Sequence, residues 1–282
     1  MALSESGAAV KEYKMYEEFY GLKKRCFSKT PDPAFLYHGR AHAEALARLQ
    51  YAVEERELVL LTGDIGSGKT TLSRALIDLL DDSYRPALII NPRLSPAQFL
   101  RTLAKKLGVA KPARNKADLI EQINARLYAA YEDGVCPVVI VDEAQLIPGK
   151  DTFEEIRLLT NYQLDDKNLM SLVLIGQSEL RERLKRPAYE ALRQRIGMSC
   201  HLGPLGEADA GEYVRHRLKV GGREAPLFTE GAVLAIHRYS GGVPRLMNTI
   251  ATGALLTGLG KGASEITPEI IDEAVSDLGL AG

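Results

Sequence analysis

The sequence predicts an α/β protein with a parallel five-stranded sheet, followed by a smaller helical domain. Short apolar runs, suited to strands buried on both faces, alternate with amphipathic segments up to about residue 206. After Pro204 the strand pattern stops and helix-like segments follow. With 282 residues, 45% of them hydrophobic, the chain is long enough for one large or two modest domains.

The region before the first strand contains three segments. Residues 1–14 are small and polar and are predicted to be disordered. An aromatic-rich segment follows from Met15 to Tyr37 and contains the turn Thr30-Pro31-Asp32-Pro33, where proline fixes φ and stops a helix. Residues 40–55 carry apolar side chains at helical spacing, which predicts a helix that leads into the sheet.

Five short apolar runs are predicted to form the strands. They are Leu58–Thr62, Ala87–Asn91, Pro137–Asp142, Leu169–Gly176 and Met198–Leu202. Amphipathic segments separate them, such as 96–107 and 117–131. Because parallel strands need helical crossovers between them, this alternation indicates a parallel sheet.

The last part of the chain is predicted to be helical. Helix-like segments cover 207–219, 230–239 and 243–259, and a further helix opens at Thr267-Pro268-Glu269 with proline at its first position. These segments place a domain boundary near residue 207. We therefore expect an α/β domain over 15–206 and a helical domain over 207–282.

The run after the first strand has the residue types and spacing of a phosphate-binding loop. Its residues are Gly63, Asp64, Ile65, Gly66, Ser67, Gly68, Lys69 and Thr70, with Thr71 next in the following helix. Glycines let the loop curl so that backbone N–H groups point at a phosphate, and the helix N-terminus favours the anion. We expect Lys69 to reach the β- and γ-phosphates of ATP and Thr70 to bind Mg²⁺. The alternative is a Gly-rich turn that arose by chance.

Two adjacent carboxylates, Asp142 and Glu143, end the third predicted strand at the sheet edge where ligands of such folds bind. We expect Asp142 to hold Mg²⁺ and Glu143 to orient and polarise the attacking water. An acidic N-cap of a helix is the alternative. One step beyond the fourth strand, Gln177 is a candidate sensor of water or phosphate, and a structural residue at a helix start otherwise.

Three arginines are candidates for phosphate contacts. Arg193 and Arg195 precede the fifth strand, and Arg245 follows the turn Gly241-Gly242-Val243-Pro244 at a helix start. An arginine finger donated by a neighbouring subunit accelerates hydrolysis about 10³- to 10⁵-fold. Ordinary surface salt bridging is the alternative for each of them.

Composition narrows the function classes. The sequence has 36 Lys and Arg residues and 37 Asp and Glu residues, so its net charge is near zero. It therefore lacks the overall positive charge that is typical of a nucleic-acid-binding protein. The three cysteines lack metal spacing and indicate reduced thiols in the cytoplasm. The five histidines also lack metal spacing and are expected to be structural or solvated. The sequence has neither a secretion-signal pattern nor an apolar run that could span a bilayer.

These motifs together resemble an AAA+ ATPase with a helical lid. The Walker A run 63–70, the Walker B pair Asp142-Glu143, Gln177, the arginine pair and Arg245 carry the resemblance. It implies the strand order 5-1-4-3-2, ATP and Mg²⁺ as cofactors, and a homo-oligomer, either a ring or a helical filament, whose active sites are completed in trans. Within the arginine pair, Arg195 is the better match for the finger.

A narrower resemblance is to the GspA/ExeA family of secretion and pilus-assembly ATPases. It rests on the aromatic segment from Phe19 to Leu46, on Asp142-Glu143-Ala144-Gln145 and on Gly176-Gln177-Ser178-Glu179-Leu180. It implies that residues 35–40 cover the adenine. Cys26 stands where the family more usually has proline. Many ExeA-like proteins continue into a membrane span and a peptidoglycan-binding module, whereas this sequence stops at Gly282.

The resemblance leaves three functions open. The first is an oligomeric ATPase in the cytoplasm that assembles or remodels an envelope secretion or pilus complex, held at the inner membrane through an anchored partner. The second is a transposon target-selection ATPase of the TnsC and IstB type, for which the basic stretches 181–186 and 105–116 would face duplex DNA or else be solvated helix faces. The third is a nucleotide-sensing scaffold, against which the presence of Glu143 argues.

Overall fold

The computed structural model describes residues 16–28, 30, 32–164 and 167–280. The segment expected to be disordered, 1–14, lies outside these residues. The chain forms two compact units. Of the described residues, the α/β unit comprises those within 30–205 together with 243–245, and the helical unit comprises 16–28, 206–242 and 246–280.

Five strands of the α/β unit form one sheet in the order β2-β3-β6-β1-β7, and each neighbouring pair is parallel. The strands are β1 (Leu58–Gly63), β2 (Tyr84–Ile89), β3 (Cys136–Val141), β6 (Ser171–Gly176) and β7 (Ile196–Leu202). Numbered as the five main strands along the chain, this is the predicted order 5-1-4-3-2. Both the fold class and the strand order are confirmed.

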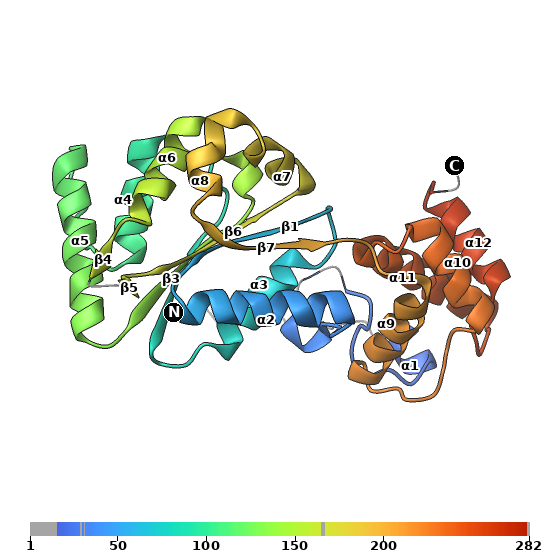
Figure 1. Cartoon of the computed structure of the whole chain (residues 1–282). Helices are drawn as coiled ribbons and strands as arrows, with labels where there is room; N and C mark the ends of the chain where they lie inside the picture. Colours follow the sequence, from blue (N-terminus) through green and yellow to red (C-terminus); the bar gives the residue numbers. More distant parts are fainter. Residues whose placement is uncertain (1–15, 29, 31, 165–166, 281–282) are drawn as a thin grey trace, which may run out of the picture. The chain divides into compact units, whose positions relative to one another are not determined.

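Helices cover both faces of the sheet (Figure 1). One face holds α2 (Arg40–Glu54) and α3 (Lys69–Leu79). The other holds α4 (Pro96–Lys106), α5 (Lys116–Glu132), α6 (Lys150–Leu159), α7 (Ser178–Leu184) and α8 (Glu190–Arg193). Three short 3-10 helices complete the unit: η1 (Pro33–Phe35), η2 (Ala144–Leu146) and η3 (Pro187–Tyr189).

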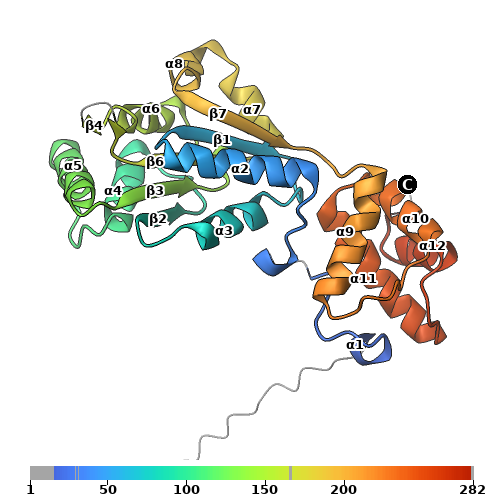
Figure 2. The same ribbon diagram turned by 60° about the horizontal axis from the view of Figure 1, so that its bottom comes forward.

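Side-chain alternation along the central strands explains this layering. In β1, Leu58 and Leu60 pack with α4 to α8, whereas Val59 and Leu61 pack with α2 and α3. All residues of β1, β3 and β6 are buried. Successive side chains in a strand point to opposite faces, so strands covered on both faces are apolar throughout. Figure 2 shows the same two helical layers from another direction.

The predicted elements differ from the observed ones in a few places. Strand β2 starts three residues earlier than expected and ends at Ile89, ahead of Asn91, whose φ of 56° departs from extended backbone. The sequence reasoning missed α6 and the small antiparallel pair of β4 (Gln163–Leu164) and β5 (Lys167–Asn168). Both lie between the third and fourth main strands, in a connection that the strand periodicity does not describe.

The helical unit contains α1 (Tyr16–Phe19), α9 (Glu207–Val220), α10 (Glu230–Ser240), α11 (Pro244–Lys261) from Leu246 onward, and α12 (Pro268–Asp277). The start of the aromatic segment packs here. Phe27 meets Phe228 edge-to-face with ring centroids 5.7 Å apart, and the buried Arg217 donates from Nε to the carbonyl oxygen of Cys26 at 2.6 Å. Residues 16–28 are thus grouped with the helical unit, whereas the sequence prediction placed them with the α/β domain.

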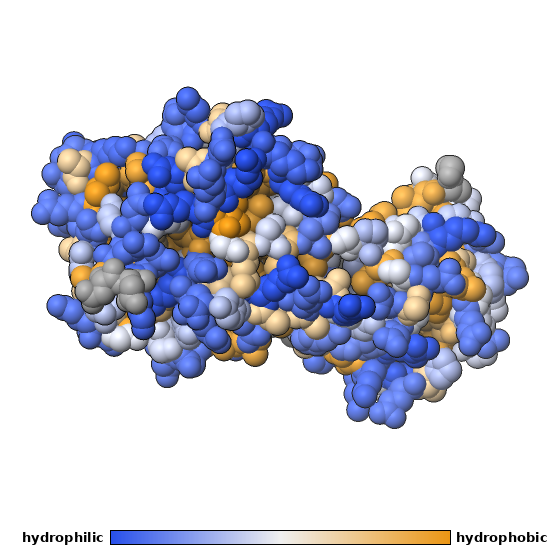
Figure 3. All heavy atoms as spheres, in the orientation of Figure 1, coloured by the Kyte–Doolittle hydropathy of each residue, from blue (hydrophilic) through white to orange (hydrophobic). Residues whose placement is uncertain are grey.

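The surface is largely hydrophilic on the face drawn in Figure 3, with scattered apolar areas. Ile65 and Ile90 of the α/β unit are 59% and 66% exposed. Within the described ranges, every helix is too short or too polar to cross a membrane. The described cysteines, Cys26, Cys136 and Cys200, are buried free thiols.

Candidate functional site

The predicted phosphate-binding loop connects β1 to α3 at the carboxyl edge of the sheet. Gly66 and Gly68 have φ values of +84° and +99°, a backbone region that L side chains rarely adopt. A Cβ atom on Gly66 would lie 2.5 Å from the Cβ of Arg245, so this position also lacks room for a side chain. The loop therefore has the curled backbone that the glycine pattern predicts.

Two side chains from outside the motif hold this loop. The buried His42 of α2 donates from Nε2 to the carbonyl oxygen of Ser67 at 2.9 Å. Ser178, at the start of α7, donates from Oγ to Oδ1 of Asp64 at 2.5 Å. His42 was expected to be structural or solvated. Its contact with the loop was missed because no spacing rule links a lone histidine to a motif 25 residues away.

Lys69 begins α3 and is 8% exposed. Its Nζ donates to the carbonyl oxygens of Gly63 and Asp64, both at 2.8 Å, so the ammonium lies inside the curve of the loop. Burial lowers the pKa of Lys69, while Glu143 and Asp142 act in the opposite direction. A buried cation beside backbone N–H groups at a helix start is suited to a phosphate.

Asp142 and Thr70 contact one another across β3 and α3. Asp142 follows the last residue of β3 and is 7% exposed. Burial raises the pKa of Asp142, whereas its hydrogen bonds from the Glu143 amide, at 2.8 Å, and from the Thr70 side chain lower it. A carboxylate and a hydroxyl side by side form the oxygen-donor set that Mg²⁺ prefers. The two residues predicted to hold the metal are thus brought together.

Glu143 adopts left-handed backbone, with φ 56° and ψ 38°. A non-glycine residue in this region costs about 1–3 kcal/mol and is found mostly at functional sites. The carboxylate accepts hydrogen bonds at Oε2 from Gln145 Nε2 at 2.5 Å and from Gln177 Nε2 at 3.3 Å. The expected catalytic base and the expected sensor therefore lie in direct contact.

Gln145 is a site residue to which the sequence reasoning assigned no role. Besides its bond to Glu143, its Oε1 accepts from the backbone N of Gln177 at 3.1 Å. Gln145 thus joins the ends of β3 and β6 through one side chain. The available signal was its place two residues after Glu143 in Asp142-Glu143-Ala144-Gln145.

Arg245 contacts the phosphate-binding loop. Its backbone N donates to the carbonyl oxygen of Gly66 at 3.2 Å, and its charge is one of the influences that lower the pKa of Lys69. The side chain is exposed. The structure therefore brings a second cation to the loop from more than 170 residues further along the chain.

Arg193 and Arg195 lie away from this site. Both are exposed, and they precede the amino end of β7, whereas the loop follows the carboxyl end of β1. The strands are parallel, and six residues of strand span roughly 20 Å, so Arg195 cannot reach the phosphate-binding loop of its own chain. Arg195 donates to Asn161 Oδ1 at 2.7 Å, and Arg193 donates to the carbonyl oxygen of Lys185 at 3.0 Å.

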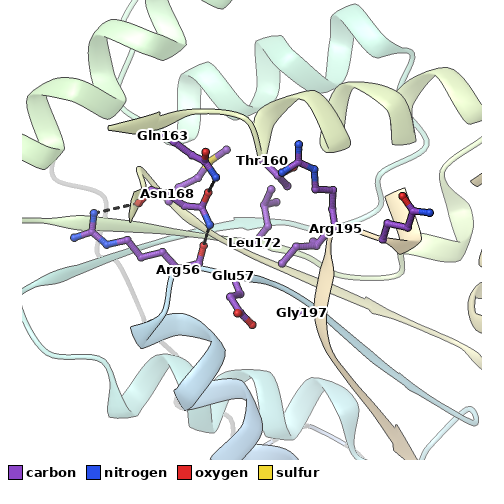
Figure 4. Close-up of a pocket in the computed structure, with 11 residues that line it drawn as sticks. Arg56, Glu57, Thr160, Gln163, Asn168, Leu172, Arg195 and Gly197 are labelled. Atoms are coloured by element: carbon purple, nitrogen blue, oxygen red, sulfur yellow. Dashed lines mark hydrogen bonds between the residues drawn. The ribbon is translucent and has the colours of Figure 1, made fainter. Parts of the chain in front are cut away.

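A cavity of about 240 Å³ lies at this amino edge. Arg195 and Glu57 line it together with Leu58, Leu172 and Gly197 from the starts of three strands. Figure 4 shows Arg195 and Glu57 at this cavity, with the hydrogen-bonded pair of Gln163 and Asn168 beside them. The amino edge therefore has a recess next to the arginine that was predicted to be a finger.

The structure divides the basic stretch 181–186. Arg183 is partly buried and donates to backbone oxygens, and Lys185 pairs with Glu182. Arg181 and Arg186 are exposed. Arg183 therefore contributes little to a charged surface that could face DNA.

The site fits a nucleoside triphosphate with Mg²⁺ on its own geometry. The glycine curve leaves space that a Cβ would fill, Lys69 and Arg245 supply positive charge, and Asp142 with Thr70 supplies oxygen ligands. In the described part of the chain, no group of three or more His, Cys, Asp or Glu side chains is placed to hold a metal. Mg²⁺ binding with few protein ligands is consistent with this, because Mg²⁺ usually keeps waters and phosphate oxygens as ligands.

Comparisons with known proteins show what the chain resembles. Residues 52–184 match the family model of the AAA domain. General secretion pathway protein A of Aeromonas hydrophila is 43% identical over 256 residues, which are 89% of this chain and 46% of that protein. The chain spans about half the length of the curated relatives it matches.

Solved structures show the same fold. The ORC2 protein of Aeropyrum pernix is 19% identical with a TM-score of 0.65, covering 90% of this chain and 72% of that chain. Drosophila ORC bound to DNA is 17% identical with a TM-score of 0.69, covering 99% and 70%. The fold is that of AAA+ P-loop ATPases, and residues 52–184 match the AAA domain. In sequence the chain is similar to general secretion pathway protein A (GspA) of A. hydrophila.

Proposed function

We propose that this AAA+ protein forms homo-oligomers, as a ring or a helical filament, in which ATP hydrolysis drives the assembly or remodelling of a secretion- or pilus-type envelope complex. The observation that carries the hydrolytic part is the contact of Glu143 with Gln177, next to the pair of Asp142 and Thr70. A protein that only bound ATP would not need a carboxylate held in strained backbone at this point.

Each residue of the site has a separate role in this proposal. Lys69 and the loop amides bind the β- and γ-phosphates, and Arg245 adds charge above the loop. Asp142 and Thr70 hold Mg²⁺, which neutralises charge on the phosphates when bound. Glu143 accepts a proton from the attacking water, and Gln177 and Gln145 hold its carboxylate in place. The contacts described above support these roles.

Arg195, with Arg193 as the second candidate, completes the site of a neighbouring copy. The arginines lie at the opposite sheet edge from their own phosphate-binding loop, so they are available only to another subunit. In a head-to-tail arrangement, the amino edge of one copy faces the carboxyl edge of the next. The arginines of one copy then lie beside the phosphate-binding loop of its neighbour. Such a heterologous contact produces a ring if it closes and a filament if it does not.

The envelope role rests on the relation to general secretion pathway protein A. We propose that the chain works in the cytoplasm and reaches the inner membrane through an anchored protein partner. The alternative partner, duplex DNA, gains little support from the stretch 181–186, since Arg183 is used internally and Lys185 is paired. In the second basic stretch, Lys105, Lys106 and Lys111 are exposed, so the experiment below includes DNA.

The experiment that tests this function measures ATP hydrolysis against protein concentration, with and without duplex DNA at low salt, while light scattering follows particle size. We expect turnover per subunit to rise with concentration, to require Mg²⁺, and to be indifferent to DNA. Turnover that is stimulated by DNA together with growth into long particles would replace the envelope role with the transposon-type function. Turnover independent of concentration would contradict a site completed in trans.

A further inference from the structure

We propose that Arg183 is a positioning residue that fixes the loop of Glu143 and the segment leading to Arg193 and Arg195 in one arrangement. The proposal rests on the proposed function, in which these residues serve two different active sites. Arg183 lies on α7, between the two sheet edges. Its contacts reach both segments. The position of Glu143 in one active site is therefore coupled to the positions of Arg193 and Arg195, which serve the active site of a neighbouring copy.

On one side, Arg183 holds the turn that follows Glu143. Its Nη1 donates to the carbonyl oxygen of Ile147 at 2.5 Å and to that of Gln145 at 3.5 Å. These carbonyls belong to η2 and its C-cap, directly after the left-handed residue Glu143. Because Gln145 in turn donates to the Glu143 carboxylate, movement of this turn displaces the expected base.

On the other side, Arg183 holds η3. Its Nε donates to the hydroxyl of Tyr189 at 2.9 Å, and its guanidinium lies 5.3 Å from the centre of the Tyr189 ring. The same guanidinium lies 4.9 Å from the ring centre of Phe153 on α6, and the two rings meet edge-to-face. Phe153 is 1% exposed, so this cluster is anchored in the core of the α/β unit.

The segment held by Tyr189 leads directly to the two arginines. Tyr189 is the N-cap of α8, and α8 ends at Arg193. Arg193 donates back to the carbonyl oxygen of Lys185, the C-cap residue of α7. The backbone N of Arg195 donates to the carbonyl oxygen of Leu192. A shift of Tyr189 therefore moves the start of the short helix that presents Arg193 and Arg195.

The chemistry of the contacts requires arginine. A guanidinium is planar, so it can face aromatic rings while its N–H groups donate within its own plane. Lysine would keep the charge but would have to choose between the carbonyls, the phenol and the rings. Arg183 is thus distinguished from Arg181, an exposed residue two positions earlier on the same helix for which no such contacts are observed.

The test compares Arg183→Lys with the matched control Arg181→Lys in the full chain. We expect Arg183→Lys to lower kcat about 10- to 100-fold, because small misplacements of catalytic groups cost about that much. Affinity for ATP, measured with a fluorescent ATP analogue, should stay unchanged because the phosphate-binding loop is not touched. Arg181→Lys should change neither. An unchanged kcat in Arg183→Lys would overturn the proposal.

Hydrogen exchange provides a second readout that does not depend on hydrolysis. In Arg183→Lys, amides of 144–147 and of 187–193 should both exchange faster, while β1 and β3 keep their protection. Faster exchange in only one of the two segments would contradict the proposal that Arg183 holds both of them in place. If the wild-type chain shows no ATP turnover, the proposed function fails, and exchange alone decides whether Arg183 links the segments.

Tyr189→Phe covers the case in which Arg183→Lys loosens the whole fold. It removes one hydroxyl and keeps the ring, so the core packing around Phe153 is retained. We expect a smaller fall in kcat in the same direction, with faster exchange at 187–193 and unchanged affinity for ATP. Wild-type kcat and exchange in Tyr189→Phe, combined with global loosening in Arg183→Lys, would assign Arg183 to general stability and overturn the proposal.

Discussion

At the carboxyl edge of the sheet, charged and polar side chains contact one another, whereas at the amino edge the arginines are exposed and donate to neutral oxygens. Lys69 and Asp142 are buried in a connected group of side chains and loop carbonyls. Arg193 and Arg195 bond only a backbone carbonyl and an amide side chain among the contacts described. These hydrogen-bond partners carry no charge, and the carboxylate of Glu57 lines the same cavity as Arg195.

The carboxyl edge is therefore organised to bind a ligand. The amino edge instead presents exposed arginines to a ligand that is bound elsewhere. A buried, hydrogen-bonded constellation loses little entropy when its ligand arrives. An exposed arginine interacts most strongly with an anion when a second surface excludes water from the pair. The two edges are complementary in charge to the same anion, a polyphosphate, and the experiments below separate their contributions.

The largest effect should come from removing the exposed edge. We expect Arg195→Ala to lower kcat about 10³- to 10⁵-fold, the range for an arginine finger, with ATP affinity nearly retained. Mixing Arg195→Ala with Lys69→Ala chains should recover activity, since one copy supplies the loop and the other the arginine. Turnover by the mixture is measured at fixed total protein, with Arg193→Ala as the parallel variant.

Recovery in the mixture with Arg193→Ala but not with Arg195→Ala would move the finger to Arg193. Absence of recovery with both variants, although each still forms mixed oligomers, would count against a site shared between subunits. The comparison of the two edges would then reduce to a binding site and an unrelated basic surface.

A somewhat smaller effect is expected at the connected edge. Glu143→Gln should bind ATP as the wild type does and hydrolyse it about 10²- to 10⁴-fold more slowly, because the amide cannot accept the proton. Single-turnover hydrolysis and equilibrium binding separate the two effects. Glu121→Gln, an exposed exchange on α5, is the matched control. Turnover at the wild-type rate in Glu143→Gln would remove Glu143 from its assigned role.

The smallest effect should come from the loop backbone. Gly66→Ala places a Cβ 2.5 Å from the Cβ of Arg245 at a φ of +84°. We expect ATP affinity to fall about tenfold, because left-handed backbone costs an alanine about 1–2 kcal/mol. Gly134→Ala, at a φ of +71° with nothing within 4 Å, carries the same strain without the clash and away from the loop. Equal affinities in the two variants would show that the loop tolerates a side chain.

The sequence predicted the parts of the fold that follow from local patterns. Strands β1, β3 and β6 are apolar because both of their faces are buried, and the glycine spacing marks the loop before Lys69. Strand β2 was misplaced by three residues, since its early residues are partly exposed and lack the apolar signal. Helix α6 has apolar residues at helical spacing, Phe153, Ile156 and Leu159, a signal that the sequence reasoning did not use. Strands β4 and β5 have two residues each, which is too short for a repeated pattern.

The site was predicted less completely than the fold, for a physical reason. Asp142, Glu143 and Gln177 each follow a strand, so the parallel sheet alone brings them to one edge. His42, Gln145 and Arg183 contribute through hydrogen bonds that span sequence separations of 25 to 38 residues. A single sequence has no pattern that predicts such contacts. These hydrogen bonds depend on the distance between two elements in the fold, and not on the spacing of residues within one helix or strand.

The left-handed backbone of Glu143 has a consequence for the evolution of stability. Glycine or asparagine at position 143 would relieve the backbone and would be favoured by selection for a more stable fold alone. Glutamate persists there only if turnover outweighs that gain. Variants selected for higher melting temperature should therefore lose Glu143 early. Such variants would gain stability and lose ATP hydrolysis.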